Sequence, residues 1–302
     1  MSIIGSNILA GASVAGGYSG NIAVTHANSP FISVYPWSSG FGTKYSDPTT
    51  LPGTSLSMSQ SLAFNPDGAS IAVGHTGSPF VSVYPWSSSG FGTKYANPAT
   101  LPTGLGWSVA FSPDGADIAI AHSNSPFISV YPWSSSGFGT KYSNPSTLQT
   151  NTSLVVKFSP DGADIVTASN SSPYVNAYSW SSSGFGTKYS NPSTLPTGMS
   201  QGAAFSPDGA DIAVAHYNSP FVSVYPWSSS GFGAKYANPA TLPIGGGQGV
   251  AFSPDGADIA VAHYTSPFIS VYPWSSSGFS TKYADPSTLP TGPGYGVAFS
   301  PA

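Results

Sequence analysis

Five histidines occupy one position of a repeated pattern: His26, His75, His122, His216 and His263. Histidine nitrogens bind metal ions and move protons near neutral pH. Chelation needs several nitrogens about 2 Å from one ion, whereas equivalent residues of neighbouring sheets lie roughly 10 Å apart. We therefore predict no shared metal site, and we expect each histidine to hydrogen-bond to its own loop.

Pairs of aspartates three residues apart suggest carboxylate dyads. They are Asp114/Asp117, Asp161/Asp164, Asp208/Asp211 and Asp255/Asp258. Aspartate beside glycine is also turn chemistry, in which the side chain accepts backbone amides. Because these acids recur in near-identical turns, we interpret them as part of the scaffold. The chain has no Glu, Arg or Cys, so no general acid and base stand out, and we predict neither an enzyme nor a cofactor.

The charge content narrows the classes of partner. Only 6% of the 302 residues are charged, and the net charge is −4. Nucleic-acid binders normally present clustered Lys and Arg to phosphates, whereas the seven lysines here are scattered. No apolar run is long enough to span a bilayer. These observations argue against nucleic acid and against membrane insertion.

An internal repeat organises the chain. The phenylalanine of an FSPDG-like core recurs 47 positions apart at Phe64, Phe111, Phe158, Phe205, Phe252 and Phe299. Within a copy, apolar residues alternate with small or polar ones over short runs bounded by Gly and Pro, which predicts strands. Four strands fit one copy: SVAF (a), DIAIAH (b), FISVY (c) and a stretch from GTKY onward (d). We expect strand c to end or bulge at Pro132, which lacks an amide donor.

A period of this length is typical of a propeller blade. We therefore predict an all-β chain: a single six-bladed β-propeller of four-stranded antiparallel blades over residues 20–302, preceded by a lead-in at residues 1–19. The C-terminal residues 295–302 match strand a, and we expect them to join the first blade and close the ring. The alternative is that residues 9–16 fill that position, which would leave the last strand free for self-association.

The segments FSPDGADIAIA and SPFISVYPW resemble the FSPDG-type WD-repeat β-propeller pattern. The resemblance covers residues 20–302 and implies the fold, but it implies little about function because this fold serves many functions. The sequence departs from the pattern in lacking the Gly-His pair before strand a and in having Tyr-Pro-Trp where Trp-Asp is usual. Arrays of such near-identical copies also resemble propellers of bacteria and their viruses.

Differences between the copies concentrate in two connections, from strand d to the next strand a and from strand b to strand c. In an antiparallel blade both connections lie at the same end of the strands, so one face is varied. Loops held by a rigid frame commonly carry binding residues. The candidate binding face comprises Trp107, Tyr217, Tyr264, Tyr295, Asn124, Asn218, Gln201, Gln248, His26, His75, His122, His216 and His263. Drift in loops without a function is the alternative interpretation.

The fourth copy differs most from the others. Lys157 replaces an alanine on strand a, Ser169 replaces the histidine, and Asn176 replaces a serine. A lysine on the innermost strand must reach water or an acid, because burial of an unpaired charge is costly. Lys157 is therefore a candidate asymmetric site, with relaxed drift in one copy as the alternative.

These features favour a non-catalytic binding or assembly scaffold that presents its variable loops to a protein or glycan. A virion or cell-surface location agrees with the low charge and the lack of Cys. A secreted multivalent lectin is one alternative function, and a propeller hydrolase is another.

Overall fold

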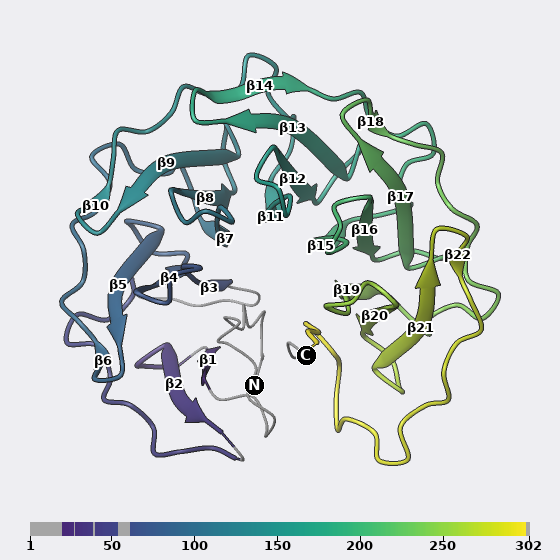
Figure 1. Cartoon of the computed structure of the whole chain (residues 1–302), viewed down its shortest axis with the longest axis horizontal. Coiled ribbons are helices and arrows are strands. Elements are labelled where there is room, and N and C mark those ends of the chain that lie inside the picture. The colour runs from purple at the N-terminus through teal and green to yellow at the C-terminus, as the bar shows by residue number, and fades with distance from the viewer. Residues whose placement is uncertain (1–19, 27, 39, 54–60, 300–302) are drawn as a thin grey trace. The chain divides into compact units, whose positions relative to one another are not determined.

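The computed structural model describes residues 20–26, 28–38, 40–53 and 61–299. All regular elements in this part are β-strands, in five four-stranded sheets and one two-stranded sheet (Figure 1). Nothing in this part forms a helix of the length and apolarity needed to cross a membrane. The predicted all-β fold of six repeated propeller-type blades is confirmed.

Each complete sheet follows the chain order a, b, c, d with antiparallel neighbours. The a strands are β3 (Leu62–Phe64), β7 (Gly106–Phe111), β11 (Ser153–Phe158), β15 (Ser200–Phe205) and β19 (Gly247–Phe252). The b strands are β1 (Gly20–Thr25), β4 (Ser70–Gly74), β8 (Asp117–His122), β12 (Asp164–Ser169), β16 (Asp211–His216) and β20 (Asp258–His263).

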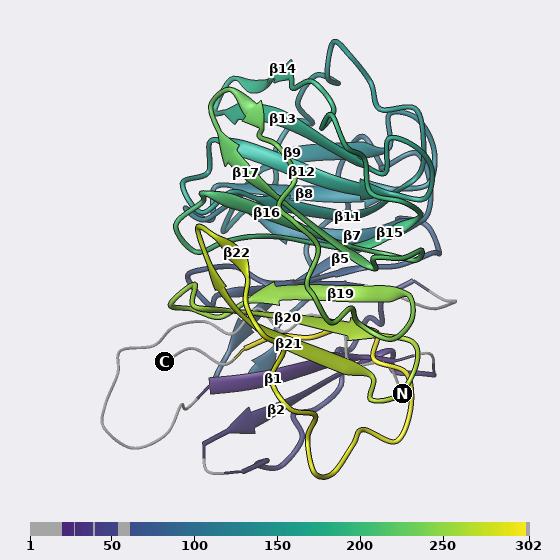
Figure 2. The same cartoon turned by 90° about the vertical axis from the view of Figure 1, so that its right-hand side faces the viewer.

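The c and d strands complete each sheet. The c strands are β2 (Ile32–Trp37), β5 (Val81–Ser87), β9 (Ile128–Ser134), β13 (Val175–Ser181), β17 (Val222–Ser228) and β21 (Ile269–Ser275). The d strands are β6 (Gly90–Phe91), β10 (Gly137–Phe138), β14 (Gly184–Lys188), β18 (Gly231–Phe232) and β22 (Gly278–Phe279). Figure 2 shows β19 to β22 side by side.

Two predictions about strand boundaries were wrong. Strand β9 does not end at Pro132 but continues to Ser134, with Pro132 opposite Asp117. The missing amide is tolerated there, and the Pro132 carbonyl still accepts from the amide of Gly139 at 2.8 Å. Strand d begins at the Gly-Phe of the SerSerSerGlyPhe turn rather than at GTKY. Its glycine has positive φ, +99° at Gly137, which suits a residue without a Cβ.

The chain divides into two compact units, residues 1–143 with 300–302 and residues 144–299. Within each unit, successive sheets pack face to face through apolar residues. In the first unit, Val81 and Val83 of β5 pack against Val109 and Ile118 of the following sheet. In the second, Val222 and Val224 of β17 pack in the same way against the sheet that contains β19 to β22. Small alanines on the b strands give the neighbouring side chains room.

Edge-to-face aromatic contacts reinforce each packed face. The ring of Trp133 contacts Tyr95, Phe111 and Phe138, with centroids 5.0 to 5.6 Å apart. Such pairs contribute about 0.5–1.5 kcal/mol each beyond the area that they bury. Equivalent contacts recur around Trp86, Trp227 and Trp274.

Predicted ring closure is not seen in the described residues. Strand β1 pairs with β2 in a two-stranded sheet, and residues 293–299 have no strand assignment. Residues 9–16, the alternative source of the missing strand, and residues 300–302 lie outside the described part. Closure therefore stays a prediction.

An aspartate at the start of strand b joins consecutive sheets. The Oδ1 of Asp164 accepts from Tyr189 Oη at 2.8 Å, and its Oδ2 accepts from Trp227 Nε1 of the next sheet at 2.9 Å. Asp211 repeats this arrangement with Tyr236 and Trp274, at 3.0 and 3.1 Å. We call this three-residue contact the sheet tie. It gives a buried carboxylate two donors, which offsets the cost of its burial.

The tie is altered where the sequence lacks the aspartate. Asn21 occupies the position in the first copy, and its Oδ1 and the Nε1 of Trp86 are both buried without a hydrogen-bond partner in the described residues. Ser70 occupies it in the second copy and is buried. A serine hydroxyl presents one acceptor atom where a carboxylate presents two.

Restoring the aspartate in the second copy is expected to stabilise the first unit. In Ser70→Asp, the new carboxylate can accept from Tyr95 and Trp133. These two residues are the equivalents of the Tyr189 and Trp227 that donate to Asp164. Two charge-assisted bonds less the burial cost should add about 1–2 kcal/mol to the free energy of unfolding. Urea titration followed by tryptophan fluorescence measures the change. Ser70→Asn is the uncharged control, and a loss of stability in Ser70→Asp alone would contradict the expectation.

Candidate functional site

The two variable connections are hydrogen-bonded to each other in the third and fifth copies. In the third copy, Thr103 Oγ1 donates to the carbonyl of Ser125 at 2.7 Å, and Asn124 Nδ2 donates to the carbonyl of Thr103 at 2.8 Å. In the fifth copy, Thr197 and Asn218 make the same contacts at the same distances. The predicted binding residues Asn124 and Asn218 therefore use amide donors within the scaffold.

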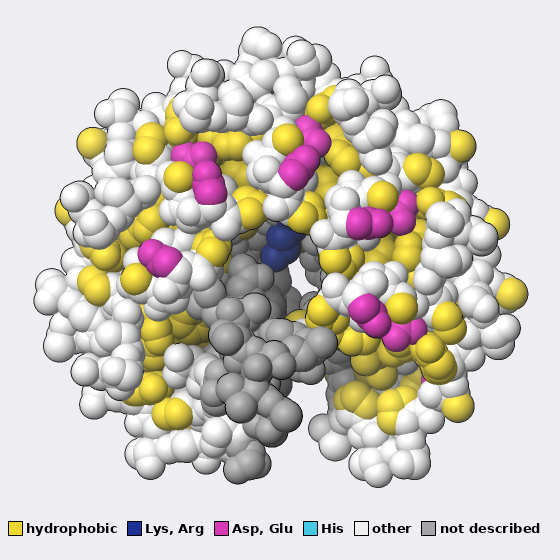
Figure 3. Space-filling model, in the orientation of Figure 1, with side chains coloured by type: hydrophobic (Ala, Val, Ile, Leu, Met, Phe, Trp, Pro, Cys, Tyr) yellow, Lys and Arg dark blue, Asp and Glu magenta, His cyan; other side chains and the backbone are white. Residues whose placement is uncertain are grey.

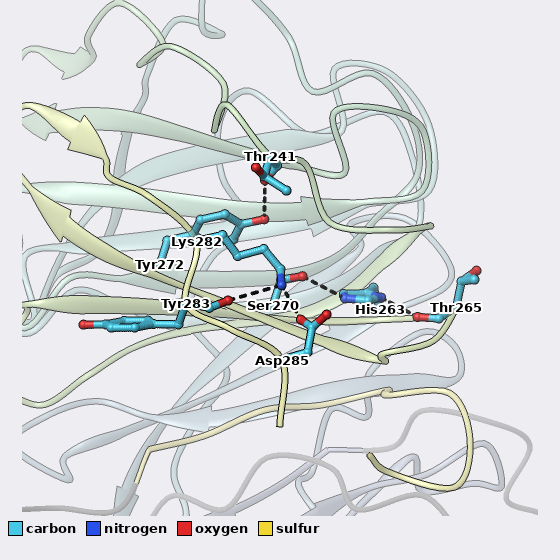
Figure 4. A network of polar contacts seen from close by, with 8 residues as sticks. All are labelled: Thr241, His263, Thr265, Ser270, Tyr272, Lys282, Tyr283 and Asp285. Atoms are coloured by element: carbon cyan, nitrogen blue, oxygen red, sulfur yellow. Dashed lines mark hydrogen bonds and ion pairs between the residues drawn. The ribbon is translucent and has the colours of Figure 1, made fainter. Parts of the chain in front are cut away.

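The histidines lie in the interior. The side chains of His75, His122, His216 and His263 are 0% exposed. In each, Nε2 is 3.0 Å from a serine hydroxyl on strand c of the same copy. Nδ1 of His263 donates to the carbonyl of Thr265 at 2.7 Å (Figure 4). His26 is partly buried, with Nε2 3.0 Å from Ser33 Oγ.

Burial disfavours the charged form of these rings. Desolvation lowers the pKa of His75, His122 and His216 to about 4, against a smaller opposing effect of the backbone carbonyl that each ring bonds. The pKa of His263 is also lowered by desolvation. Each pair has the histidine–serine geometry of an activated nucleophile, but both partners are buried, so the arrangement joins strands b and c.

The fourth copy changes both partners of this pair together. Ser169 and Asn176 replace the histidine and the serine, and Ser169 Oγ donates to the carbonyl of Ser171 at 3.1 Å. The paired replacement follows from the contact between these positions in the other copies.

Three other predicted site residues are buried or only partly accessible. Gln248 is buried, and its Nε2 donates to the carbonyl of Gly246 at 3.3 Å. Gln201 is half-buried. Trp107 is also half-buried, and its Nε1 is buried without a partner in the described residues. Of these side chains, only parts of Gln201 and Trp107 reach the surface.

Tyrosines of the variable loops remain at the surface of the second unit. Tyr217 is 53% exposed and Tyr264 is 50% exposed. The rings of Tyr264 and Tyr295 meet edge to face, with centroids 6.0 Å apart and an interplanar angle of 85°. Ile244, which sequence reasoning did not single out, is 53% exposed on the intervening loop. We call Tyr217, Ile244, Tyr264 and Tyr295 the tyrosine patch.

Gly246 links the two halves of the patch. A Cβ at this glycine would lie 2.9 Å from Cδ2 of Tyr217, so the ring of Tyr217 rests on bare backbone. The Gly246 carbonyl accepts from the amide of Tyr264 at 3.1 Å. The run Gly245-Gly246-Gly247 was a possible sequence signal for this close approach.

Lys157 lies on β11, where the aligned positions hold Ala110 and Ala204. It is half-buried, and desolvation lowers the pKa of its ammonium group. No carboxylate forms an ion pair with it among the described residues, in which the salt bridges are Lys44–Asp47 and Lys282–Asp285. It lies within strand a of the fourth copy, outside the variable connections that carry the tyrosine patch.

The aspartates divide into two groups. Asp114 sits in its turn, accepting from Ser112 Oγ at 2.6 Å and from the Ala116 amide at 3.0 Å. These bonds, the serine first, lower the pKa of its carboxyl group. Asp164 and Asp211 belong to the sheet ties, and Asp117 and Asp258 accept from the hydroxyls of Tyr142 and Tyr283 at 2.9 and 3.0 Å. In Figure 3 the carboxylates form separate groups on one face, and the described residues contain no cluster of three metal-ligating side chains.

Lys235, which follows β18, folds back onto the chain. Lys235 Nζ donates to the carbonyl of Tyr236 at 3.0 Å and to the side chain of Asn238. Lys282 forms an ion pair with Asp285 (Figure 4). Asp285 also lines a hollow of about 280 Å³, together with Ile269 and Val271.

Comparison with known proteins gives the fold. No family model matches the sequence, and no curated protein matches it. Among solved structures, hydrazine synthase of Kuenenia stuttgartiensis has a TM-score of 0.62 at 16% identity, over 87% of this chain and 82% of that one. A candidate 6-phosphogluconolactonase from Bacteroides uniformis has a TM-score of 0.63 at 16% identity, over 86% of this chain and 79% of that one. At this identity the likeness extends to the fold alone.

Proposed function

We propose that this chain is a non-catalytic binding module of the WD-repeat type that presents its variable loops to a partner molecule. The observation that carries this proposal is the tyrosine patch. Within near-identical copies, large aromatic side chains stand half-exposed at positions where the copies differ. The common scaffold does not require aromatic residues there, because the third copy has Ser123 where the fifth has Tyr217.

Internal use of the other polar groups supports the same conclusion. The histidines bond to strand c, the loop asparagines fasten the loops, and the repeated aspartates serve turns and sheet ties. The polar side chains of this frame make internal hydrogen bonds, whereas the aromatic rings of the patch are exposed. This arrangement suits recognition, because the loops are already ordered before a ligand binds.

A loop exchange tests the proposal. In the variant, HYNS at 216–219 and HYTS at 263–266 both become HSNS, the loop of the third copy. Wild-type protein and variant are applied to arrays of purified surface proteins and of glycans. We expect signals that the exchange removes while the thermal midpoint stays within about 2 °C. If no array gives a signal that depends on the exchange, the proposal fails.

Hydrolysis is the second candidate function, favoured by the likeness to a candidate lactonase. For this chain it would need an acid or base outside the turns and ties, and Lys157 is the asymmetric group that differs from its equivalents. Turnover of a lactone or ester panel that is lost in Lys157→Ala would establish hydrolysis.

A further inference from the structure

We propose that the tyrosine patch binds a neutral oligosaccharide. This inference rests on the proposed binding function and names the chemical class of the ligand. The residues that carry it are Tyr217, Tyr264 and Tyr295, with the glycine run 245–247 beneath them.

The first reason is charge. The variable loops of the second unit, at 148–152, 170–173, 195–199, 217–220, 242–248, 264–267 and 289–296, contain no Asp, Glu, Lys or Arg. A charged ligand would lose hydration on this surface without gaining an ion pair. Uncharged hydroxyl groups do not incur that cost, so the surface matches a neutral ligand.

The second reason is shape. Pyranose rings have an apolar face of C–H groups and a rim of hydroxyls, and an exposed tyrosine offers an apolar ring with a polar tip. Tyr217 packs closely against Gly246, where a Cβ would lie 2.9 Å from its Cδ2, and this contact supports one side of the ring while the side chain stays half-exposed. Tyr264 and Tyr295 stand at 85° to each other, so a sugar that stacks on one meets the edge of the other.

The third reason is size. A stable protein partner would cover about 800 Å² and some 20–30 residues on this side. The half-exposed large side chains here are grouped on neighbouring loops of two copies. So small a group of exposed side chains fits an oligosaccharide better than a protein surface.

The chain supplies matched variants. Ser123 of the third copy aligns with Tyr217 and Tyr264, so Tyr217→Ser and Tyr264→Ser introduce a residue that the scaffold already holds at this position. Asp255→Asn, in the exposed turn at the other end of strand b, is a control distant from the patch.

The experiment combines two measurements. A glycan array with neutral and acidic members identifies binders, and NMR titration with the best soluble oligosaccharide gives the affinity. We expect neutral members to bind, each serine variant to weaken binding ~10-fold, which corresponds to about 1.4 kcal/mol, and the double variant to abolish it. The control should bind like the wild type, and all variants should keep the wild-type thermal midpoint.

Other outcomes separate the two proposals. Binding only to the protein array, lost in the serine variants, leaves the binding function in place and overturns the glycan ligand. Preference for acidic glycans also overturns the inference of a neutral ligand. Glycan binding that the serine variants leave unchanged overturns the assignment to this patch. No loop-dependent binding on either array overturns both.

Discussion

Lowering the pH from 7 to 5 is expected to remove about 2 kcal/mol of unfolding free energy for each of His75, His122 and His216. Their folded-state pKa is about 4, below the unfolded value of 6.5. Between these values the unfolded chain binds protons that the folded chain does not, so stability falls as the pH falls. The slope for each histidine is ~1.4 kcal/mol per pH unit.

Urea titrations at intervals from pH 7.5 to 4 measure this slope. His216→Ser combined with Ser223→Asn is the matched control, because it introduces the pair that the fourth copy holds as Ser169 and Asn176. The control should lose the contribution of one histidine in the second unit. A flat stability profile between pH 6.5 and 4.5, or an unchanged slope in the control, would contradict the expected burial of neutral rings.

Replacing Asp164 by alanine is expected to cost about 3–5 kcal/mol. The change leaves the Nε1 of Trp227 and the Oη of Tyr189 without their acceptor, and Trp227 is buried. Hydrogen bonds to charged groups contribute ~1.5–3 kcal/mol each. Because the tie joins the sheets of β12 and β16, the loss should appear in the unfolding of the whole second unit.

Two comparisons check this value. Asp164→Asn keeps one acceptor oxygen and should lose about half as much. Asp161→Ala removes a carboxylate three residues away that serves only its exposed turn, and it should cost ~1 kcal/mol or less. Equal losses for Asp161→Ala and Asp164→Ala, measured by urea unfolding, would show that the sheet tie does not stabilise the unit.

Periodicity carried most of the fold prediction. Two-residue alternation placed strands a, b and c, and the period of 47 gave the blades. Strand d was misplaced because its pairing residues, Gly137 and Phe138, look like turn residues in the sequence. Another feature had no sequence signal: Phe127 has φ of +69° after a cis Ser125–Pro126 bond, a conformation unusual for a bulky residue.

The sequence predicted the location of the candidate site better than the roles of its side chains. Comparison of the copies located the variable loops. It could not distinguish side chains that are available to a ligand from side chains that hydrogen-bond within the loops. The tyrosines remain at the surface, where Tyr217 is 53% and Tyr264 is 50% exposed. Asn124 and Asn218 are exposed as well, but their amides donate to backbone carbonyls of the neighbouring loop. The sheet tie was missed because its partners, Asp164 and Trp227, are 63 positions apart.

That spacing bears on how such a chain changes its length during evolution. Each tie crosses a single boundary between copies, so a duplication or deletion of one whole 47-residue unit brings every remaining carboxylate opposite an indole again. An insertion within one of the strands that carry the tie displaces the donor from its acceptor, whereas the loops can take up extra residues. Recombination between near-identical copies can therefore vary the number of sheets while keeping the joint between neighbours unchanged.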